Sequence, residues 1–364
     1  MTAIASELAE MLRHYRLAGE VVATAPLKTG HINTTHVVHT ATPGGRRRYV
    51  LQLVNGNVFR NVPGLMENVA RVTAHLRAKG GAAAARVLSV VPTSDGASCV
   101  RDAAGDWWRV YDFIEGAHTV DRVTTEDQAR EAARAFGEFQ ALLADLPGPR
   151  LHETIPDFHH TPRRVAKLRV VLAEDALGRA AEVRAETNFA LARADDADRL
   201  LALFAAGRLL ERVTHNDTKI NNVMLDDTTH RAVSVVDLDT VMPGLALYDF
   251  GELLRTSAGS TAEDDPDPTN MHVRLPLFRA LAEGWIASGA AATDAERGNL
   301  AFAGKLMAYE NGVRFLTDYL QGDVYFKVHH PHHNLDRCRS QFALVRSIEE
   351  NVDAMARIVD ECAD

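Results

Sequence analysis

The chain has 364 residues, which is long for one domain and ordinary for two lobes. Hydrophobic residues make up 46% of it and charged residues 24%, a balance that allows a sizeable core and argues against global disorder. The formal net charge of −9 argues against a nucleic-acid backbone or an anionic membrane as the main partner, although a local cationic pocket for a phosphate is invisible in a net charge.

Cysteine usage and the N-terminus indicate the compartment. The three cysteines, Cys99, Cys338 and Cys362, are far apart and form no C-x-x-C pair, so free thiols in a reducing compartment are expected. Glu7 and Glu10 lie where a signal peptide would have its apolar run, so this stretch is predicted to be an amphipathic helix. No uninterrupted apolar run approaches the length of a membrane span. We therefore expect a cytoplasmic protein, and a monomer.

The first hundred or so residues are rich in strand signals. Residues 36–54, HVVHTATPGGRRRYVLQLV, contain two β-rich runs around a Pro-Gly-Gly turn signal, which predicts a hairpin. Residues 65–80 have a helical pattern that ends at a Gly-Gly pair. Residues 85–91 and 106–116 are predicted to add strands that close the same sheet.

After residue 116 the pattern changes to helices. A helix is predicted over 126–146, with Thr124 and the acid Asp127 as its start signal. Further helical patterns cover 163–210, 296–320 and 338–361.

The order of these elements predicts an α+β fold with two lobes. Residues 1–113 form a small β-rich lobe with a β-sheet and helices, the N-lobe. Residues 114–364 form a larger, mainly helical C-lobe.

Residues 213–240, VTHNDTKINNVMLDDTTHRAVSVVDLDT, surround two short apolar runs with oxygen-bearing side chains. The two runs are separated by Asp-Asp-Thr-Thr, which is typical of a turn, so they are predicted to pair as an antiparallel hairpin. The residue before the first run, Asn222, and the residue after the second, Asp237, then lie at the same open end. Asp239 follows closely behind.

These oxygen ligands indicate a hard cation. Amide and carboxylate oxygens favour Mg²⁺ or Mn²⁺ over zinc. Mg²⁺ held by only one or two carboxylates takes its remaining ligands from water and from substrate phosphates. The hairpin therefore predicts a nucleotide as well as a metal ion.

The residues before the hairpin fit a phosphotransfer loop. His215, Asp217 and Asn222 match H-x-D-x-x-x-x-N, the spacing of a kinase catalytic loop. Asp217 must reach the attacking hydroxyl while Asn222 reaches the metal, and four intervening residues can separate those tasks across one site. Lys219 can place a cation near the γ-phosphate, and His215 is interpreted as an anchor of the loop. A lone H-x-D is common by chance, but the loop, the hairpin and the VVDLD segment together form a compound signal.

Three segments carry a family resemblance. RVTHNDTKINNVM, VVDLDTVMPG and LYDFGELLR resemble the kinase-like superfamily of aminoglycoside phosphotransferases and choline kinases. Within it, from about residue 16 to the end, the chain resembles the N-acetylhexosamine 1-kinases, through TGHINTTHVV, WRVYDFIEG and NGVRFLTDYLQGDVYF. The resemblance implies a two-lobed protein-kinase-like fold, with a nucleotide-binding sheet in the N-lobe, 1–113, and the catalytic loop and sugar site in the C-lobe, 114–364. It also implies ATP and Mg²⁺ as cofactors, and phosphorylation of the anomeric hydroxyl of N-acetylglucosamine or N-acetylgalactosamine.

The resemblance also implies roles for individual residues. Asp217 would be the catalytic base with Lys219 beside it, and Asp249 would brace the catalytic loop. The implied metal ligands are Asn222 and Asp237, with Asp239 as a second acid at the site. The implied nucleotide contacts are Gly30, Asn33, Thr34, Gln52, Tyr111 and Phe113. The implied substrate contacts are His31, Asp217, Arg314 and Tyr325.

The nucleotide assignment includes one departure from the superfamily, which has Lys or Arg on the strand that faces the α- and β-phosphates. The matching residue here is Gln52, whose amide can hydrogen-bond a phosphate but contributes no charge. Lys219 and Mg²⁺ would then have to offset the negative charge of the phosphates. The segment TGHINTT, taken alone, is equally typical of a polar hairpin turn.

Two interpretations of Arg314 remain open. Glu310, Arg314 and Asp318 follow i, i+4 spacing on one helix, so they could form a surface ion-pair ladder of little energetic value. The resemblance instead implies that Arg314 points into the sugar site with Tyr325 beyond it, and we favour this interpretation.

Three functional hypotheses follow. The favoured one is an anomeric sugar kinase. The second is the same fold acting on another small alcohol, such as an aminoglycoside, choline or homoserine; an aminoglycoside acceptor would need an acidic pocket. The third is a non-catalytic binding protein, which would be expected to lack one of Asp217, Asn222 or Asp237, and all three are present.

Overall fold

The computed structural model describes residues 6–27, 32–80 and 86–364. The chain divides into two compact units. The first, here called the sheet unit, comprises residues within 1–118 together with 145–156 and 224–242. The second, the helical unit, comprises 119–144, 157–223 and 243–364. Each unit is discontinuous in sequence, and the predicted boundary at residue 113 stays a prediction.

The sheet unit contains a five-stranded antiparallel sheet in the order β1-β2-β3-β5-β4. Its apolar positions alternate with polar ones, so Val38, Leu51 and Val110 are fully buried against helix α1. The register places Gln52 of β3 opposite Arg109 of β5. The bounds are α1 Ser6–Leu12, β1 Glu20–Pro26, β2 Thr34–Thr42, β3 Gly45–Val54, β4 Val100–Arg101 and β5 Trp107–Asp112.

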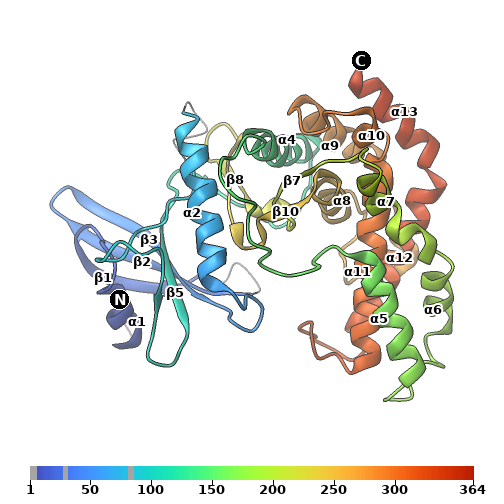
Figure 1. Ribbon diagram of the computed structural model, residues 1–364, viewed down its shortest axis with the longest axis horizontal. Helices are drawn as coiled ribbons and strands as arrows, with labels where there is room; N and C mark the ends of the chain where they lie inside the picture. Colours follow the sequence, from blue (N-terminus) through green and yellow to red (C-terminus); the bar gives the residue numbers. More distant parts are fainter. Residues whose placement is uncertain (1–5, 28–31, 81–85) are drawn as a thin grey trace. The chain divides into compact units, whose positions relative to one another are not determined.

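Helix α2, Val62–Ala78, lies next to β5 in the sheet unit (Figure 1). It begins three residues before the predicted helix because the Asn61 side chain accepts the Gly64 N–H and a proline occupies the first turn. Its buried Asn68 donates from Nδ2 to the carbonyls of His152, at 2.8 Å, and Val241, at 3.0 Å. Asn68 thereby ties the helix to the two distant segments that complete the unit.

The predicted hairpin of residues 223–236 is confirmed. Strands β8, Val223–Asp226, and β9, Ala232–Val235, are hydrogen-bonded neighbours in a three-stranded sheet with β6, Ala117–His118. The turn between β8 and β9 is closed by Asp226, whose Oδ1 accepts the backbone N–H groups of Thr228 and Thr229. Asp237 follows β9 in the left-handed conformation, with φ 60°, and starts a short 3₁₀ turn.

The helical unit is built around α11, Leu300–Gln321, which packs against α5, α8 and α12 (Figure 1). The other helices are α4 Glu126–Leu142, α5 Thr161–Glu174, α6 Arg184–Leu191, α7 Arg199–Ala205, α8 Ala246–Ser257, α9 Leu275–Ala287, α10 Asp294–Arg297, α12 His333–Glu350 and α13 Val352–Ala363. Strands β7, Glu211–Thr214, and β10, Met242–Leu245, pair beside them. No described helix is both long and apolar enough to cross a bilayer.

Three element predictions need correction. The described part of 85–91 is not a strand. It makes only an isolated bridge to β5, with hydrogen bonds at Val91 N and Ser89 O. Pro92, which follows, has no N–H with which to continue a ladder of hydrogen bonds. The segment 163–210, predicted to be helical, is divided into three helices and a 3₁₀ turn, and the first break follows from Asp175, whose left-handed conformation, with φ 36°, ends α5.

The third correction concerns the start of α4. The helix is capped by Thr125, which accepts the Gln128 N–H, and not by Thr124. Thr124 instead donates from its N–H and its hydroxyl to the Gln128 side chain. The α+β class, with a small antiparallel sheet in the N-terminal part and a mainly helical C-terminal part, is confirmed.

Candidate active site

The loop between β7 and β8 is held by a buried carboxylate from α8. The two oxygens of Asp249 accept the N–H groups of His215, at 2.8 Å, and Asn216, at 2.7 Å. Its backbone carbonyl accepts the Thr218 hydroxyl at 2.5 Å, and Gln140 donates to the carboxylate at 2.5 Å. Asp249 is fully buried, so these bonds replace water as its partners. The prediction that Asp249 braces the loop is confirmed.

His215 anchors the same loop through packing. Its ring lies edge-on to Phe136 and Phe139 of α4, with centroids 5.1 and 5.9 Å away. Its Nδ1 accepts the Asp217 N–H at 3.3 Å, and no part of the side chain is exposed. A buried ring in this position cannot reach a substrate, which agrees with its predicted role as an anchor.

Asp217 lies in this loop with its carboxylate about one quarter exposed. Lys219 Nζ is 3.0 Å from Asp217 Oδ2, and the Asn222 amide donates to the same oxygen at 3.2 Å. Burial raises the pKa of the Asp217 carboxyl, but the Lys219 ammonium and the Asn222 amide outweigh that effect, so the pKa lies below its ordinary value of 3.8. Asp217 is therefore an anion at neutral pH that can accept a hydrogen bond from a hydroxyl.

The Asn222 amide is oriented by the same contacts. Nδ2 donates to the Asp217 carbonyl at 2.9 Å as well as to its carboxylate, which leaves Oδ1 directed elsewhere. Among the described residues, none donates a hydrogen bond to Asn222 Oδ1. An amide oxygen presented in this way fits a hard cation such as Mg²⁺. The described residues contain no cluster of three or more His, Cys, Asp or Glu suited to a metal.

Arg314 of α11 lies among three aromatic rings of the helical unit. Its guanidinium carbon is 5.8 Å from the centroid of Phe158, 6.0 Å from Tyr325 and 5.3 Å from Phe326. Its Nη1 donates to Asn311 at 3.1 Å. The Tyr325 ring is 64% exposed, so this group of side chains opens to solvent at one end.

The ion-pair-ladder interpretation of α11 is wrong, because its two acids are buried and have other partners. Glu310 accepts from His159 at 3.0 Å and from Thr161 at 2.6 Å. Asp318 accepts the backbone N–H groups of residues 324–326 at 2.8 to 3.1 Å. Asp318 thus fixes the segment that carries Tyr325.

A second constellation lies in the sheet unit and centres on Arg109, which the sequence analysis missed. Its Nε and Nη2 donate to Gln52 Oε1 at 3.0 and 2.8 Å. Nη2 also donates to Asp239 Oδ2 at 2.8 Å, and Nη1 lies 2.5 Å from Asp239 Oδ1. Asn33 donates to Asp239 Oδ2 at 2.6 Å. The Arg109 and Asp239 side chains are 1% and 3% exposed, so this is a buried ion pair.

The remaining predicted nucleotide contacts differ in exposure. Tyr111 is buried, and its hydroxyl has no hydrogen-bond partner among the described residues. Burial raises the pKa of Tyr111, so this hydroxyl stays neutral. Phe113 is half-buried beneath the Arg48 guanidinium, 3.8 Å from its centroid, and Thr34 is exposed at the start of β2. Gly30 and His31 lie outside the described residues.

Asp237 lies in the same unit as Arg109. The negative charge of Asp237 is one of those that raise the pKa of Arg109. Joint ligation of one ion by Asn222, Asp237 and Asp239 stays a prediction. For Asp239, the contacts to Arg109 and Asn33 identify a further role, as the counter-ion of a buried cation.

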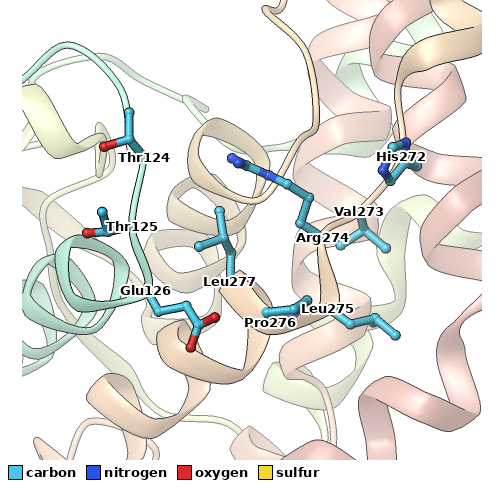
Figure 2. Close-up of a pocket in the computed structure, with 9 residues that line it drawn as sticks. All are labelled: Thr124, Thr125, Glu126, His272, Val273, Arg274, Leu275, Pro276 and Leu277. Carbon is cyan, nitrogen blue, oxygen red and sulfur yellow. The ribbon is translucent and has the colours of Figure 1, made fainter.

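A separate pocket of about 500 Å³ lies in the helical unit between the start of α4 and the segment leading into α9 (Figure 2). Of the described residues that line it, none is a predicted site residue. Its charged groups are Glu126 and Arg274, and Arg274 donates to the Ser257 carbonyl at 3.1 Å. The pocket contains no part of the H-x-D-x-x-x-x-N loop.

Comparison with known families identifies a match over most of the chain. The family described as the phosphotransferase enzyme family matches residues 24–285.

Solved structures show the same fold at low identity. The chain is similar to a microcompartment-associated aminopropanol kinase, with a TM-score of 0.67, 18% identity, and coverage of 96% of this chain and 98% of that one. It is also similar to an aminoglycoside phosphotransferase from Alicyclobacillus acidocaldarius, with a TM-score of 0.61, 16% identity and coverage of 99% and 98%. A spectinomycin phosphotransferase solved with ADP and spectinomycin gives a TM-score of 0.56, 12% identity and coverage of 100% and 99%. The kinase-like fold inferred from the sequence is thus confirmed.

Proposed function

Because this chain belongs to the phosphotransferase enzyme family, we propose that it transfers a phosphoryl group from ATP to the anomeric hydroxyl of an N-acetylhexosamine. The observation that carries the proposal is the loop of Asp217, which Asp249 holds rigidly while its carboxylate stays ionised and partly exposed. One of the similar structures contains ADP, which supports a nucleotide as the donor.

Asp217 is suited to orienting a hydroxyl rather than to strong proton abstraction. Its lowered pKa makes it a weak base. Phosphoryl transfer passes through a loose transition state in most analyses, so positioning and charge neutralisation supply most of the catalysis. An anomeric hydroxyl is more acidic than an ordinary alcohol, which lowers the demand on the base further. Lys219, 3.0 Å from Asp217, adds positive charge next to the attacking oxygen.

The metal assignment rests on donor chemistry. Asn222 and Asp237 are the residues that would hold Mg²⁺, the first through an amide oxygen that no described residue engages. Bound Mg²⁺ would neutralise charge on the phosphate oxygens. The proposed nucleotide contacts remain those predicted from the sequence: Gly30, Asn33, Thr34, Gln52, Tyr111 and Phe113.

The side chains near Arg314 favour a neutral acceptor. A polycationic aminoglycoside would need free carboxylates, but Glu310 is occupied by His159 and Thr161, and Asp318 by three backbone N–H groups. A choline-type acceptor would use an aromatic cage for its cation, and Arg314 already places a cation among these rings. Arg314 with Tyr325 instead offers hydrogen-bond donors and a ring face, which suit a sugar.

The alternative is a kinase of another small alcohol on the same fold. The similarity to an aminopropanol kinase supports this candidate. The two candidates use the same phosphoryl donor, ATP, and differ in the alcohol that accepts the phosphoryl group.

An acceptor panel decides between them. Purified protein would be incubated with Mg-ATP and either hexoses, N-acetylhexosamines, aminoglycosides, choline or amino alcohols, and ADP release measured. We expect acceptor-dependent ADP release with N-acetylglucosamine or N-acetylgalactosamine. Release with an amino alcohol or aminoglycoside alone would overturn the sugar assignment and keep the family's chemistry, whereas no release with any acceptor would contradict the kinase proposal.

A further inference from the structure

We propose that Arg109 is a positioning residue for the nucleotide: it locks the side-chain amide of Gln52 so that Nε2, as a polarised hydrogen-bond donor, faces a phosphate of the nucleotide. The proposal rests on the proposed use of a nucleotide and adds a residue and a role that the sequence did not suggest. All of its residues belong to the sheet unit.

Arg109 cannot act on a ligand directly, because it is buried and four of its five N–H bonds donate to neighbouring side chains. A guanidinium has five N–H bonds. Nε and one N–H of Nη2 point to Gln52, and the other N–H of Nη2 points to Asp239. Nη1 contacts Asp239 Oδ1 at 2.5 Å and Met66 Sδ at 3.7 Å. With the side chain 1% exposed, the charge must act through its neighbours.

Gln52 is the neighbour through which it can act. Its Oε1 accepts two hydrogen bonds from Arg109, and because a guanidinium can only donate, the oxygen of the amide must face Arg109 and the nitrogen must face away. Nε2 donates to Thr35 Oγ1 at 3.1 Å, its one hydrogen bond among the described residues, so its second N–H is available. An amide whose oxygen accepts from a cation is a stronger donor at nitrogen.

Asp239 keeps this arrangement stable in the free protein. A buried guanidinium without a counter-ion would be strongly unfavourable, and Asp239 supplies the compensating charge through both carboxylate oxygens. Asn33, whose Oδ1 accepts the Asn55 N–H, donates to the same carboxylate and connects it to the start of β2. The cation that the superfamily has on β3 is thus moved one strand away, to the register partner of Gln52 on β5.

The test compares Mg-ADP binding in the full-length protein by calorimetry. Gln52→Glu keeps the size of the side chain and an acceptor for Arg109, but replaces the donor with a negative charge. We expect it to weaken Mg-ADP binding at least tenfold while adenosine, which has no phosphate, binds as it does to the wild type. The double variant Arg109→Met with Asp239→Leu removes both charges and frees the amide. Because Asp239 is also a predicted metal ligand, this variant is compared with the wild type for ADP without Mg²⁺, and we expect a loss of about threefold to tenfold for ADP and none for adenosine.

The matched control is Arg46→Gln, which removes an exposed cation from the same strand β3, and it should bind Mg-ADP as the wild type does. Unchanged Mg-ADP binding by Gln52→Glu would overturn the inference even if the double variant fails to fold, and so would equal losses for ADP and adenosine. Failure of the wild type to bind Mg-ADP would refute the proposed function together with this inference. If the wild type binds Mg-ADP and the variants of Gln52 and Arg109 bind the nucleotide equally well, this inference is refuted but the proposed function is not.

Discussion

In the described part of the chain, each unit has a buried cation–carboxylate pair beside its functional residues, and these two pairs differ in chemistry. The sheet unit has Arg109 and Asp239, whose side chains are 1% and 3% exposed. The helical unit has His159 and Glu310, at 4% and 0%. Arg109 orients Gln52, while His159 Nε2 lies 3.1 Å from the carbonyl of Asn216 and so holds the loop of Asp217.

The two pairs differ in whether the cation can lose its proton as the pH changes. Both nitrogens of His159 face acceptors, the carboxylate of Glu310 and a carbonyl, and this arrangement favours the doubly protonated ring. Burial lowers the pKa of His159, but Glu310 outweighs it, so the pKa lies above the ordinary 6.5. Arg109 keeps its charge at any ordinary pH, because the pKa of a guanidinium is already far above neutrality and Asp239 raises it further. The sheet unit therefore has a permanent charge and the helical unit a pH-dependent one.

The largest effect is expected for Asp217→Asn. The loop is held by Asp249 and His159, and Asp217 itself is not needed for its shape, so the variant should fold normally. Turnover should fall roughly 10²- to 10⁴-fold, the usual contribution of a positioned acid–base group, because the neutral amide orients the hydroxyl less well and cannot take up its proton. The measurement is ADP release at saturating Mg-ATP and acceptor, with Asp227→Asn, an exposed acid of the β8–β9 turn, as the control that should keep full activity. Near-normal turnover of Asp217→Asn would show that the loop does not carry the reaction.

Arg109→Met tests the permanent pair. It leaves Asp239 buried without a counter-ion, so the free energy of unfolding should fall by about 3–5 kcal/mol, the usual cost of breaking a buried pair. Adding Asp239→Leu should restore most of that loss. Urea unfolding of the single and double variants measures both. If the single variant is as stable as the wild type, Arg109 and Asp239 are not coupled as described.

The pH dependence of stability tests the titrating pair. His159 has a raised pKa, so its contribution is fully present below pH 6.5 and is lost as pH rises through the folded-state value above it. The free energy of unfolding should therefore decline with pH above 6.5, with a slope of at most about 1.4 kcal/mol per pH unit. His159→Gln should abolish this slope, which urea unfolding between pH 6 and 9 would show. An identical slope in both proteins would mean that another group titrates.

Arg314→Ala should have the smallest effect. Loss of about one hydrogen bond to the acceptor, ~1 kcal/mol, should raise the acceptor KM about fivefold and change the ATP KM little. Lys305→Ala, which removes another cation from α11, is the control and should leave both constants unchanged. A change of less than twofold in the acceptor KM for Arg314→Ala would exclude Arg314 from the acceptor site.

Local spacing made part of this account predictable from sequence. The loop of Asp217 and the β8–β9 hairpin are encoded by residues close together, so turn chemistry and spacing were sufficient. The bracing role of Asp249, by contrast, was implied by the family resemblance. Helix starts were less predictable, because Thr124 and Thr125 are both good caps and only the geometry chooses Thr125. The break after α5 depends on a left-handed Asp175, a conformation that an aspartate tolerates without requiring it.

The Arg109 constellation was not predictable in the same way. Arg109 is 57 residues from Gln52 and 130 from Asp239, so only the strand register and the fold bring them together. One signal was available: an arginine inside the strand-like run WWRVYD is a charge in an apolar setting, and such a charge needs a buried partner. The identity of that partner could not be read from the sequence, because several acids were possible.

The site of transfer is tested most directly by capping one oxygen of the acceptor. ADP release from Mg-ATP would be compared for N-acetylglucosamine and for its methyl α- and β-glycosides, which keep every other hydroxyl and the acetamide. In a productive complex only one hydroxyl of the sugar can lie within about 3 Å of both Asp217 and the γ-phosphate, so capping the anomeric oxygen would remove the nucleophile. We expect turnover of the free sugar and none of either glycoside. Efficient turnover of a methyl glycoside would contradict transfer to the anomeric hydroxyl.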